Sequence, residues 1–327
     1  MIKIEDAYKA VREVLPEGEL YAVGGCVRDT LLKKTPKDWD FCTSLTPEEM
    51  KPLIKKAGRH VYSIGEKFGT LGFKVPVVEY NDYDYDFGPQ WHTMETFVYV
   101  EVTTYRDEKY TLGSRKPEVT FGKTLKEDLV RRDFTINAMA FDGVDYVDLF
   151  ASELDLTRKR IKSVGEPKKM ISDDPLRILR ALRFSIQLDF EIEGNLFNHL
   201  KRFCSKLFSV AIERQQVELD KMFSLNPQKA LDLLNEIGYI DNFLPELKSY
   251  KNLLPQLKLS EKLEGKNIDE TWKKILSKTG EEFYYRPEED NYYLTNNNSE
   301  RTRFLNRGIS ARFKFSNQRR KIITGDK

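Results

Sequence analysis

The sequence predicts an α/β head with a mixed β-sheet, followed by an all-α second half. In the first half of the 327 residues, short β-branched or aromatic runs alternate with helical stretches. From Asp173 onward, apolar residues recur at helical spacing, as at Leu176, Leu179 and Leu182. With 40% hydrophobic and 32% charged residues, the chain can bury a sizeable core over more than one domain, which excludes disorder over most of its length.

The predicted strands of the head are short runs rich in β-branched and aromatic residues. They span Leu20–Val23, Asp38–Cys42, His60–Ile64, Thr70–Val75, Phe97–Thr104 and Glu118–Phe121. Helices are predicted at Val27–Lys33, where Gly24-Gly25 opens the turn, and at Pro47–Lys56, where Thr46 is a suitable cap. The polar, aromatic and acidic segment 80–87 (YNDYDYDF) is expected to be an exposed loop or a hairpin extension.

Charge and cysteine composition narrow the class of protein. Fifty-four Lys and Arg against 52 Asp and Glu leave a formal charge of +2, so any basic surface must be local. Three cysteines without a CxxC pair argue against a disulfide framework or a thiolate metal site, and favour a reducing cytoplasm. No apolar run approaches the roughly 18 residues of a membrane span, and the start of the chain lacks a signal-peptide core. We therefore expect a cytoplasmic protein with no membrane partner.

The end of the chain combines arginine with phenylalanine, a mixture that can grip phosphates and stack on unpaired bases. The candidate RNA-binding residues are Arg301, Arg303, Arg307, Arg312, Arg319 and Arg320. A solvated basic tail explains an isolated run of charge equally well.

Gly24-Gly25 lies between a predicted strand and a predicted helix, where backbone N–H groups can approach a phosphate. Two common glycine-rich motifs do not fit. A dinucleotide-binding GxGxxG needs glycine where Asp29 stands, and a P-loop at Gly122-Lys123-Thr124 needs glycine where Pro117 stands. The glycine spacing thus excludes a nicotinamide-dependent oxidoreductase.

Asp38 and Asp40 are candidate catalytic and metal-binding residues. Within a strand, a period of two points both carboxylates to one face. Hard carboxylate oxygens suit Mg²⁺, and two Mg²⁺ ions can clamp the attacking and leaving oxygens of an in-line phosphoryl transfer. Glu101 is a candidate third carboxylate, although a solvated turn and a surface glutamate would explain these residues as well.

The segment 131–137 (RRDFTIN) is a second dense polar cluster. Arg131 and Arg132 can neutralise triphosphate oxygens, and Asp133 and Asn137 can hydrogen-bond ribose hydroxyls. A helix cap with an internal salt bridge is the structural alternative.

Together, these segments resemble a known family in order and spacing. The segments GGCVRDTLL, KDWDF, GEKFGT, VEVTTYR, LKEDLVRRDFTINAMAFD, DDPLRILRALRF and ERQQVELDKM resemble the class II tRNA nucleotidyltransferases, the CCA-adding enzymes. These belong to the polymerase-β-like nucleotidyltransferases. The resemblance is detailed over about residues 18–190 and looser to about 248.

The resemblance implies roles for individual residues. Asp38 and Asp40 would hold two Mg²⁺ ions, and Gly24, Gly25 and Arg28 would contact the incoming CTP or ATP. Arg131, Arg132, Asp133 and Asn137 would form the part that recognises the ribose. Asp174 and Arg177, in DDPLR, would read the base, and Arg180 joins them as a nucleotide-binding candidate.

The base-reading role also has a physical rationale. Cytosine and adenine both present an amine donor beside a ring-nitrogen acceptor, whereas uracil and guanine present a carbonyl beside an N–H. On one helical turn, Asp174 can accept from the amine while Arg177 donates to the ring nitrogen. An ordinary helix start with an aspartate cap is the alternative, and both can hold together.

The implied domains are a nucleotidyltransferase head at 1–148, a helical neck at 149–205, a helical body at 206–258 and a tail at 259–327. The implied activity adds CMP, CMP and AMP from CTP and ATP to the 3′ end of tRNA. An A-adding enzyme and a poly(A) polymerase remain open. The ordinary length of the loop 106–121 disfavours a CC-adding enzyme, and the intact carboxylates disfavour an inactive RNA-binding relative.

The sequence departs from the family pattern in two places within the resembling region. Ala151-Ser152 replaces the Gly-Gly that often follows the aspartate of the third motif, which bears on hinge flexibility between head and neck. The segment 76–98 is longer than the short turn usual before VEVTT.

Overall fold

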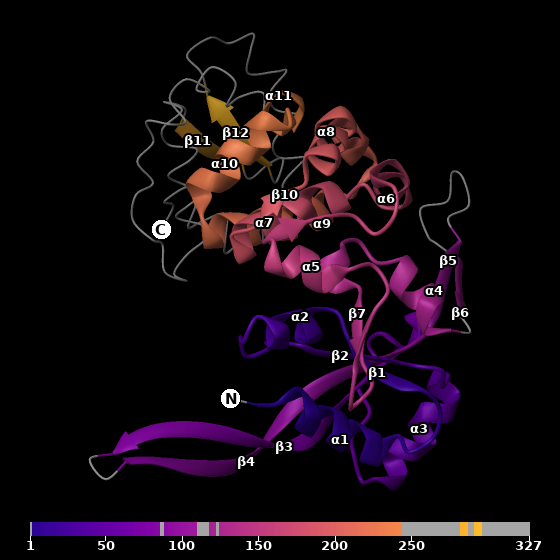
Figure 1. Ribbon diagram of the computed structural model, residues 1–327. Helices are drawn as coiled ribbons and strands as arrows, with labels where there is room; N and C mark the ends of the chain where they lie inside the picture. Colours follow the sequence, from indigo (N-terminus) through magenta and orange to yellow (C-terminus); the bar gives the residue numbers. More distant parts are fainter. Residues whose placement is uncertain are drawn as a thin grey trace. The chain divides into compact units, whose positions relative to one another are not determined.

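The computed structural model describes residues 2–85, 88–109, 118–121, 124–243, 282–286 and 291–295. The chain divides into two compact units, with the boundary between Glu166 and Pro167. The units are described separately below, and Figure 1 labels their helices and strands.

The first unit is built on a six-stranded sheet in the order β3-β4-β2-β1-β7-β8. The strands are β1 (Leu20–Val23), β2 (Trp39–Thr43), β3 (Thr70–Tyr85), β4 (Gly88–Thr104), β7 (Met139–Phe141) and β8 (Tyr146–Asp148). β2 and β4 run parallel and the other neighbours run antiparallel, which confirms the predicted mixed sheet.

The helices of this unit begin at recognisable capping signals or turns. They are α1 (Ile4–Val14), α2 (Gly25–Leu31), α3 (Pro47–Lys56), α4 (Leu125–Val130) and α5 (Ser152–Thr157), with 3₁₀ turns η1 (Glu66–Phe68) and η2 (Thr135–Asn137). Two short pieces, β5 (Arg106–Lys109) and β6 (Glu118–Phe121), pair as a separate ribbon, and β9 is Arg160–Ile161. The predicted cap of α3 is confirmed, since Thr46 and Glu49 form a reciprocal capping box ahead of Pro47.

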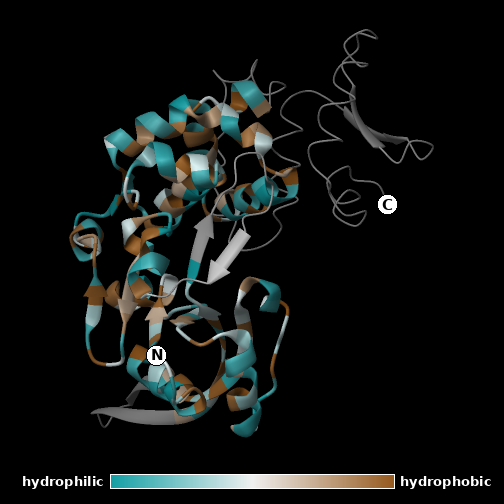
Figure 2. Cartoon of the chain, turned by 90° about the vertical axis from the view of Figure 1, so that its right-hand side faces the viewer, coloured by the Kyte–Doolittle hydropathy of each residue, from teal (hydrophilic) through white to brown (hydrophobic). Residues whose placement is uncertain are grey.

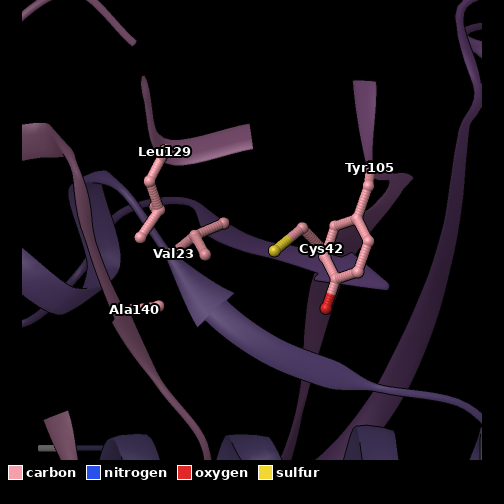
Figure 3. Packing of buried hydrophobic residues seen from close by; sticks show 5 residues of the cluster. All are labelled: Val23, Cys42, Tyr105, Leu129 and Ala140. Carbon is pink, nitrogen blue, oxygen red and sulfur yellow. The ribbon is translucent and has the colours of Figure 1, made fainter. Parts of the chain in front are cut away.

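A buried cluster fixes α4 against one face of the sheet. Val23 and Cys42 come from β1 and β2, Ala140 from β7 and Leu129 from α4, and Tyr105 follows β4 (Figure 3). Because side chains alternate along a strand, Cys42 shares this face with Asp40, two residues earlier. The cluster therefore anchors the strand that carries the candidate catalytic aspartate.

The hairpin of β3 and β4 is longer than the predicted strands. Its register runs without a break from Thr70 opposite Thr103 to Tyr85 opposite Gly88. Of the two structures predicted for the polar segment beginning at Tyr80, the hairpin extension is the one found. Figure 1 shows this ribbon projecting from the rest of the sheet.

The predicted strand His60–Ile64 is wrong. Only Tyr62 pairs, through an isolated bridge to Gly72 with N–H to carbonyl distances of 2.8 and 2.9 Å. The chain then turns through Ser63 into η1, so no second pair follows. The β-branched and aromatic residues of this segment do not reveal the difference, because a strand forms only where a neighbouring strand lies alongside it over several residues.

The second unit is helical as far as Phe243. Its helices are α6 (Pro167–Asp173), α7 (Arg177–Leu188), α8 (Gly194–Arg202), α9 (Ile212–Leu225), α10 (Pro227–Glu236) and α11 (Tyr239–Phe243), with the 3₁₀ turn η3 (Cys204–Ser209) and the strand β10 (Glu191–Ile192). Leu182 of α7, Leu219 of α9 and Leu231 of α10 are fully buried. Figure 2 shows apolar and polar residues together on these helices, as the predicted periodicity requires.

The predicted all-α tail is wrong for two described segments. Strands β11 (Glu282–Arg286) and β12 (Asn291–Thr295) pair antiparallel. Both are rich in aromatic residues, which favour a pleated ribbon. The six candidate RNA-binding arginines, Arg301 to Arg320, lie outside the described residues. Among the described helices, none combines the length and apolarity that crossing a membrane requires.

Candidate active site

The glycine turn between β1 and α2 requires glycine at its first position. Gly24 has a φ of +76°, and a Cβ there would lie 2.9 Å from Nη1 of Arg132. A side chain at this position would therefore be strained and would displace the arginine. The turn brings the backbone of Gly24-Gly25 next to one of the predicted triphosphate-binding arginines.

The sequence predicted Arg28, Asp133 and Asn137 as nucleotide-binding residues, and the structure joins them in one buried network. Nη1 of Arg28 donates to Oδ1 of Asn137 at 2.7 Å, and Nδ2 of Asn137 donates to Oδ1 of Asp133 at 3.1 Å. The backbone N–H of Phe134 also donates to Oδ1 of Asp133, at 2.8 Å. The network links residues 109 positions apart in the chain and holds them beside the glycine turn.

Arg131 and Arg132 are both held by Asp128, which sequence reasoning did not single out. The buried Asp128 carboxylate accepts from Nη2 of Arg131 at 2.6 Å and from Nη2 of Arg132 at 2.9 Å. Burial alone would raise the pKa of Asp128, but Arg132 and Arg131 lower it. The signal available in the sequence was the spacing, because residues three and four positions apart meet on one helix face.

The three candidate carboxylates lie within electrostatic range of one another. Asp40 on β2 is directly opposite Glu101 on the parallel strand β4, so both side chains lie on the same face. Asp38 is exposed and precedes β2, which begins at Trp39. Burial, together with Glu101 and Asp38, raises the pKa of Asp40 to about 6, and Arg132 partly offsets this rise. The site thus holds excess negative charge beside one arginine.

These carboxylates do not form a metal cage of protein ligands alone. Within the described part of the chain, no group of three His, Cys, Asp or Glu side chains is arranged to hold a metal ion. A site that uses one or two carboxylates and completes its ligands with substrate phosphates and water is the usual arrangement for Mg²⁺. The oxygen-rich donors present fit that second type of site.

The predicted base readers lie in the second unit. Asp174 was expected on one helical turn with Arg177, but it lies between α6 and α7, and α7 begins at Arg177. The residue before a proline is disfavoured in helical conformation, so α6 ends at Asp173 and excludes Asp174, which precedes Pro175. A hydrogen bond from N of Arg177 to O of Asp174, at 3.0 Å, keeps the two residues within one turn.

Asp174 has side-chain partners that the sequence did not reveal. Nη2 of Arg214, on α9, donates to Oδ2 of Asp174 at 2.8 Å, and the N–H of Leu176 donates to Oδ1 at 3.1 Å. Arg177 donates from Nη1 to the carbonyl of Met170 at 3.4 Å, and the Arg180 guanidinium lies 5.5 Å from the Phe184 ring centroid. Arg214 lies in ERQQVELDKM, a segment of the resemblance to which no role was assigned.

Two family models match the chain. Residues 20–162 match the poly(A) polymerase head domain, and residues 189–251 match a domain described as "Probable RNA and SrmB- binding site of polymerase A". The chain belongs to this nucleotidyltransferase family. Its first unit is the family's polymerase-β-like head, which confirms the fold class predicted from the sequence.

Curated relatives and solved structures of the family agree. The CCA-adding enzyme of Enterococcus faecalis is 39% identical over 223 residues, covering 67% of this chain and 49% of that protein. The crystal structure of the Bacillus stearothermophilus CCA-adding enzyme in complex with CTP aligns with a TM-score of 0.63 and 28% identity, over 85% of this chain and 64% of that one.

A tRNA nucleotidyltransferase complexed with a primer tRNA and an incoming ATP analogue aligns with a TM-score of 0.55 and 25% identity, over 82% of this chain and 74% of that one. The chain spans about half the length of the curated relatives it matches, 49% and 53% for two of them.

Proposed function

We propose that this protein is a tRNA nucleotidyltransferase that adds CMP, CMP and AMP from CTP and ATP to tRNA 3′ ends. The observation that carries the proposal is the register of Asp40 against Glu101, beside the glycine turn and Arg132. Carboxylates of the kind that binds Mg²⁺ therefore lie next to groups suited to a triphosphate, which supports the proposal. Relatives named CCA-adding enzymes, one of them solved with CTP, support the same activity.

Asp38 and Asp40 would hold two Mg²⁺ ions, with Glu101 as a third acidic neighbour. Burial and the acidic neighbours Glu101 and Asp38 raise the pKa of Asp40, so a bound cation would stabilise its anionic form. Bound Mg²⁺ would make the 3′-hydroxyl more acidic and offset charge on the departing pyrophosphate. The 3′-oxygen of the RNA would form a bond to the α-phosphorus as the bond from that phosphorus to pyrophosphate breaks, and the hydroxyl proton would pass to solvent.

The arginines of the head would bind the triphosphate. Arg131 and Arg132 keep 22% and 19% of their side-chain surface exposed while Asp128 fixes their orientation. A pre-oriented guanidinium loses less entropy when it binds a phosphate oxygen. The backbone of Gly24-Gly25 would approach the same phosphates.

Asp133 and Asn137 would recognise the ribose, and Arg28 would fix them. Both are nearly buried and hydrogen-bonded, so the direction of their acceptor oxygens is fixed. A ribose hydroxyl can donate to such an acceptor, whereas deoxyribose lacks that hydroxyl.

Asp174 and Arg177 would select the base, with Arg180 beside them. Arg214 holds the Asp174 carboxylate in place, and a carboxylate group only accepts hydrogen bonds. A carboxylate that can only accept rejects the carbonyl that uracil or guanine would present. We propose that this motif belongs to a helical neck at 149–205, which is followed by a body at 206–258 and a tail at 259–327.

A poly(A) polymerase or an A-adding enzyme is the second candidate, because the matching head model is named for poly(A) polymerase.

All three cysteines are buried free thiols, which suits the cytoplasmic location that we propose.

The test uses purified protein, Mg²⁺ and three tRNA transcripts that end before CCA, after C and after CC. Each is supplied with CTP, ATP or both and is resolved at single-nucleotide length. We expect all three to reach a common CCA end. Addition of A to the CC-ended transcript alone would identify an A-adding enzyme, long A tails a polymerase, and no extension would refute the proposal.

A further inference from the structure

An exposed group of aromatic and basic residues continues from the candidate carboxylates along the β3–β4 hairpin. Phe97 and Tyr99 precede Glu101 by four and two residues on β4, so all three share one face of an unbroken ladder. Phe97 and Tyr99 are 58% and 41% exposed. Large aromatic rings that are exposed to solvent beside the candidate carboxylates indicate a binding surface.

Other residues complete this surface from neighbouring segments. Lys74 is exposed and lies opposite Tyr99 in the register. The Tyr62 ring meets the Tyr99 ring edge to face at 5.5 Å, and the Arg59 guanidinium lies 5.9 Å from the Phe97 centroid. We call Arg59, Tyr62, Lys74, Phe97 and Tyr99 the Tyr99 platform.

Gly72 allows the Tyr99 ring to lie across the hairpin. A Cβ at Gly72 would lie 2.0 Å from the Tyr99 hydroxyl oxygen, so any side chain there would push the ring away. Burial and the neighbouring Glu101 carboxylate raise the pKa of the Tyr99 hydroxyl. The absence of a side chain at Gly72 thus gives the Tyr99 ring its place beside β3, on the face that carries Glu101.

We propose that the Tyr99 platform stacks the unpaired 3′-terminal nucleotides of the RNA primer; this rests on the proposed function. Bases of any sequence stack on aromatic rings, and lysine and arginine offset the charge of the phosphates. Tyr99 lies about 7 Å along the strand from Glu101 and Phe97 about 14 Å, at ~3.4 Å per residue. Stacked bases are about 3.4 Å apart.

If the 3′-terminal base lies at Glu101, the next base lies one stacking step back, and the Tyr99 ring lies one further step along, where it can stack on that base. Phe97 would then stack on a nucleotide further back. The surface ends at Glu95, which faces the same side as Phe97 and would repel a phosphate. Its extent therefore suits a short single strand.

The first test measures steady-state kinetics with CC-ended tRNA. Tyr99→Ala is expected to raise KM for tRNA about 5- to 100-fold, the usual effect of removing one stacking ring, with KM for ATP unchanged. Tyr99→Phe keeps the ring and removes only the hydroxyl, so its KM for tRNA should stay close to the wild-type value. Tyr146→Ala is the matched control, since Tyr146 is also 41% exposed but lies on β8 and packs against Phe141.

The second test does not need activity. tRNA carrying 5-iodouridine at the nucleotide next to the 3′ end is irradiated with the wild-type protein, and the cross-linked peptide is mapped. A cross-link at Tyr99 or Phe97 supports the platform. Cross-links elsewhere, or an unchanged KM for tRNA in Tyr99→Ala, would overturn it. If the wild type extends no tRNA, the proposed function fails while the cross-link still decides the platform.

Discussion

At the residue scale, Asp40 couples the stability of the head to pH. Burial and its acidic neighbours raise its pKa to about 6, from 3.8. A raised pKa means that the folded state holds the proton more tightly, so this contribution to stability is complete below about pH 4 and is lost as pH rises through about 6. Without Mg²⁺, the ionised site destabilises the fold at neutral pH.

Asp40→Asn should therefore stabilise the Mg²⁺-free protein at pH 7.5 by about 1–3 kcal/mol, since one pKa unit is worth about 1.4 kcal/mol, and should change little at pH 4. Urea unfolding at both pH values measures this. Glu17→Gln, at an exposed carboxylate, is the control. A less stable Asp40→Asn at pH 7.5 would show that the carboxylate is already compensated.

Asp128 is the second residue on which the site depends. Asp128→Asn should raise KM for CTP at least about 10-fold and destabilise the protein by about 1–3 kcal/mol, because Arg131 and Arg132 lose the anion that orients them. Glu127→Gln on the same helix is the control, since glutamine also completes the capping box with Thr124. An unchanged KM for CTP would remove both arginines from triphosphate binding.

At the element scale, the turn before α5 carries backbone strain. Ala151 has a φ of +55°, a left-handed conformation that glycine adopts freely and alanine does not. This is the position at which the family often has glycine. The Asp148 carboxylate pins the turn by accepting from the backbone N–H groups of Phe150 and Glu153.

Ala151→Gly should stabilise the protein by about 0.5–1 kcal/mol, because relief of strain exceeds the added freedom of the unfolded chain. Ala10→Gly within α1 should do the opposite by a similar amount or more. Both are measured as midpoints of thermal unfolding. If both variants lose stability alike, the turn carries no strain.

Signals between neighbours in the sequence predicted where helices and strands lie, but they did not predict which strands pair or how far the pairing extends. The Thr46 cap and the strand Leu20–Val23 depend on neighbours in sequence and were found with the predicted bounds. The long hairpin and the single bridge at Tyr62 depend on a distant edge. In the same way, the Asp38, Asp40 and Glu101 set was expected from residue type and period, whereas Arg214 was missed because its partner Asp174 lies 40 positions away.

At the scale of the whole molecule, the two units carry different parts of the proposed reaction. The carboxylates and triphosphate arginines lie in the first unit, and the base readers lie in the second. Base choice should therefore be separable from nucleotide transfer by mutation.

Arg177→Ala should reduce the preference for C and A over U and G by at least about 100-fold, since an unpaired polar edge is what rejects a wrong base. Incorporation of each nucleotide into tRNA ending before CCA measures this. Arg202→Ala, an arginine on α8 outside the proposed reader, should leave base choice unchanged. Unchanged selectivity in Arg177→Ala would reject its role as a reader.

The proposed reaction depends on the carboxylates that lie opposite each other on β2 and β4, Asp40 and Glu101. The most direct measurement is single-turnover extension of CC-ended tRNA with ATP and Mg²⁺ by the wild type and by Asp40→Ala, with folding of both checked by circular dichroism. We predict extension by the wild type and a loss of at least about 100-fold in a folded Asp40→Ala. Comparable rates for the two proteins would show that nucleotide transfer does not depend on the Asp40 carboxylate.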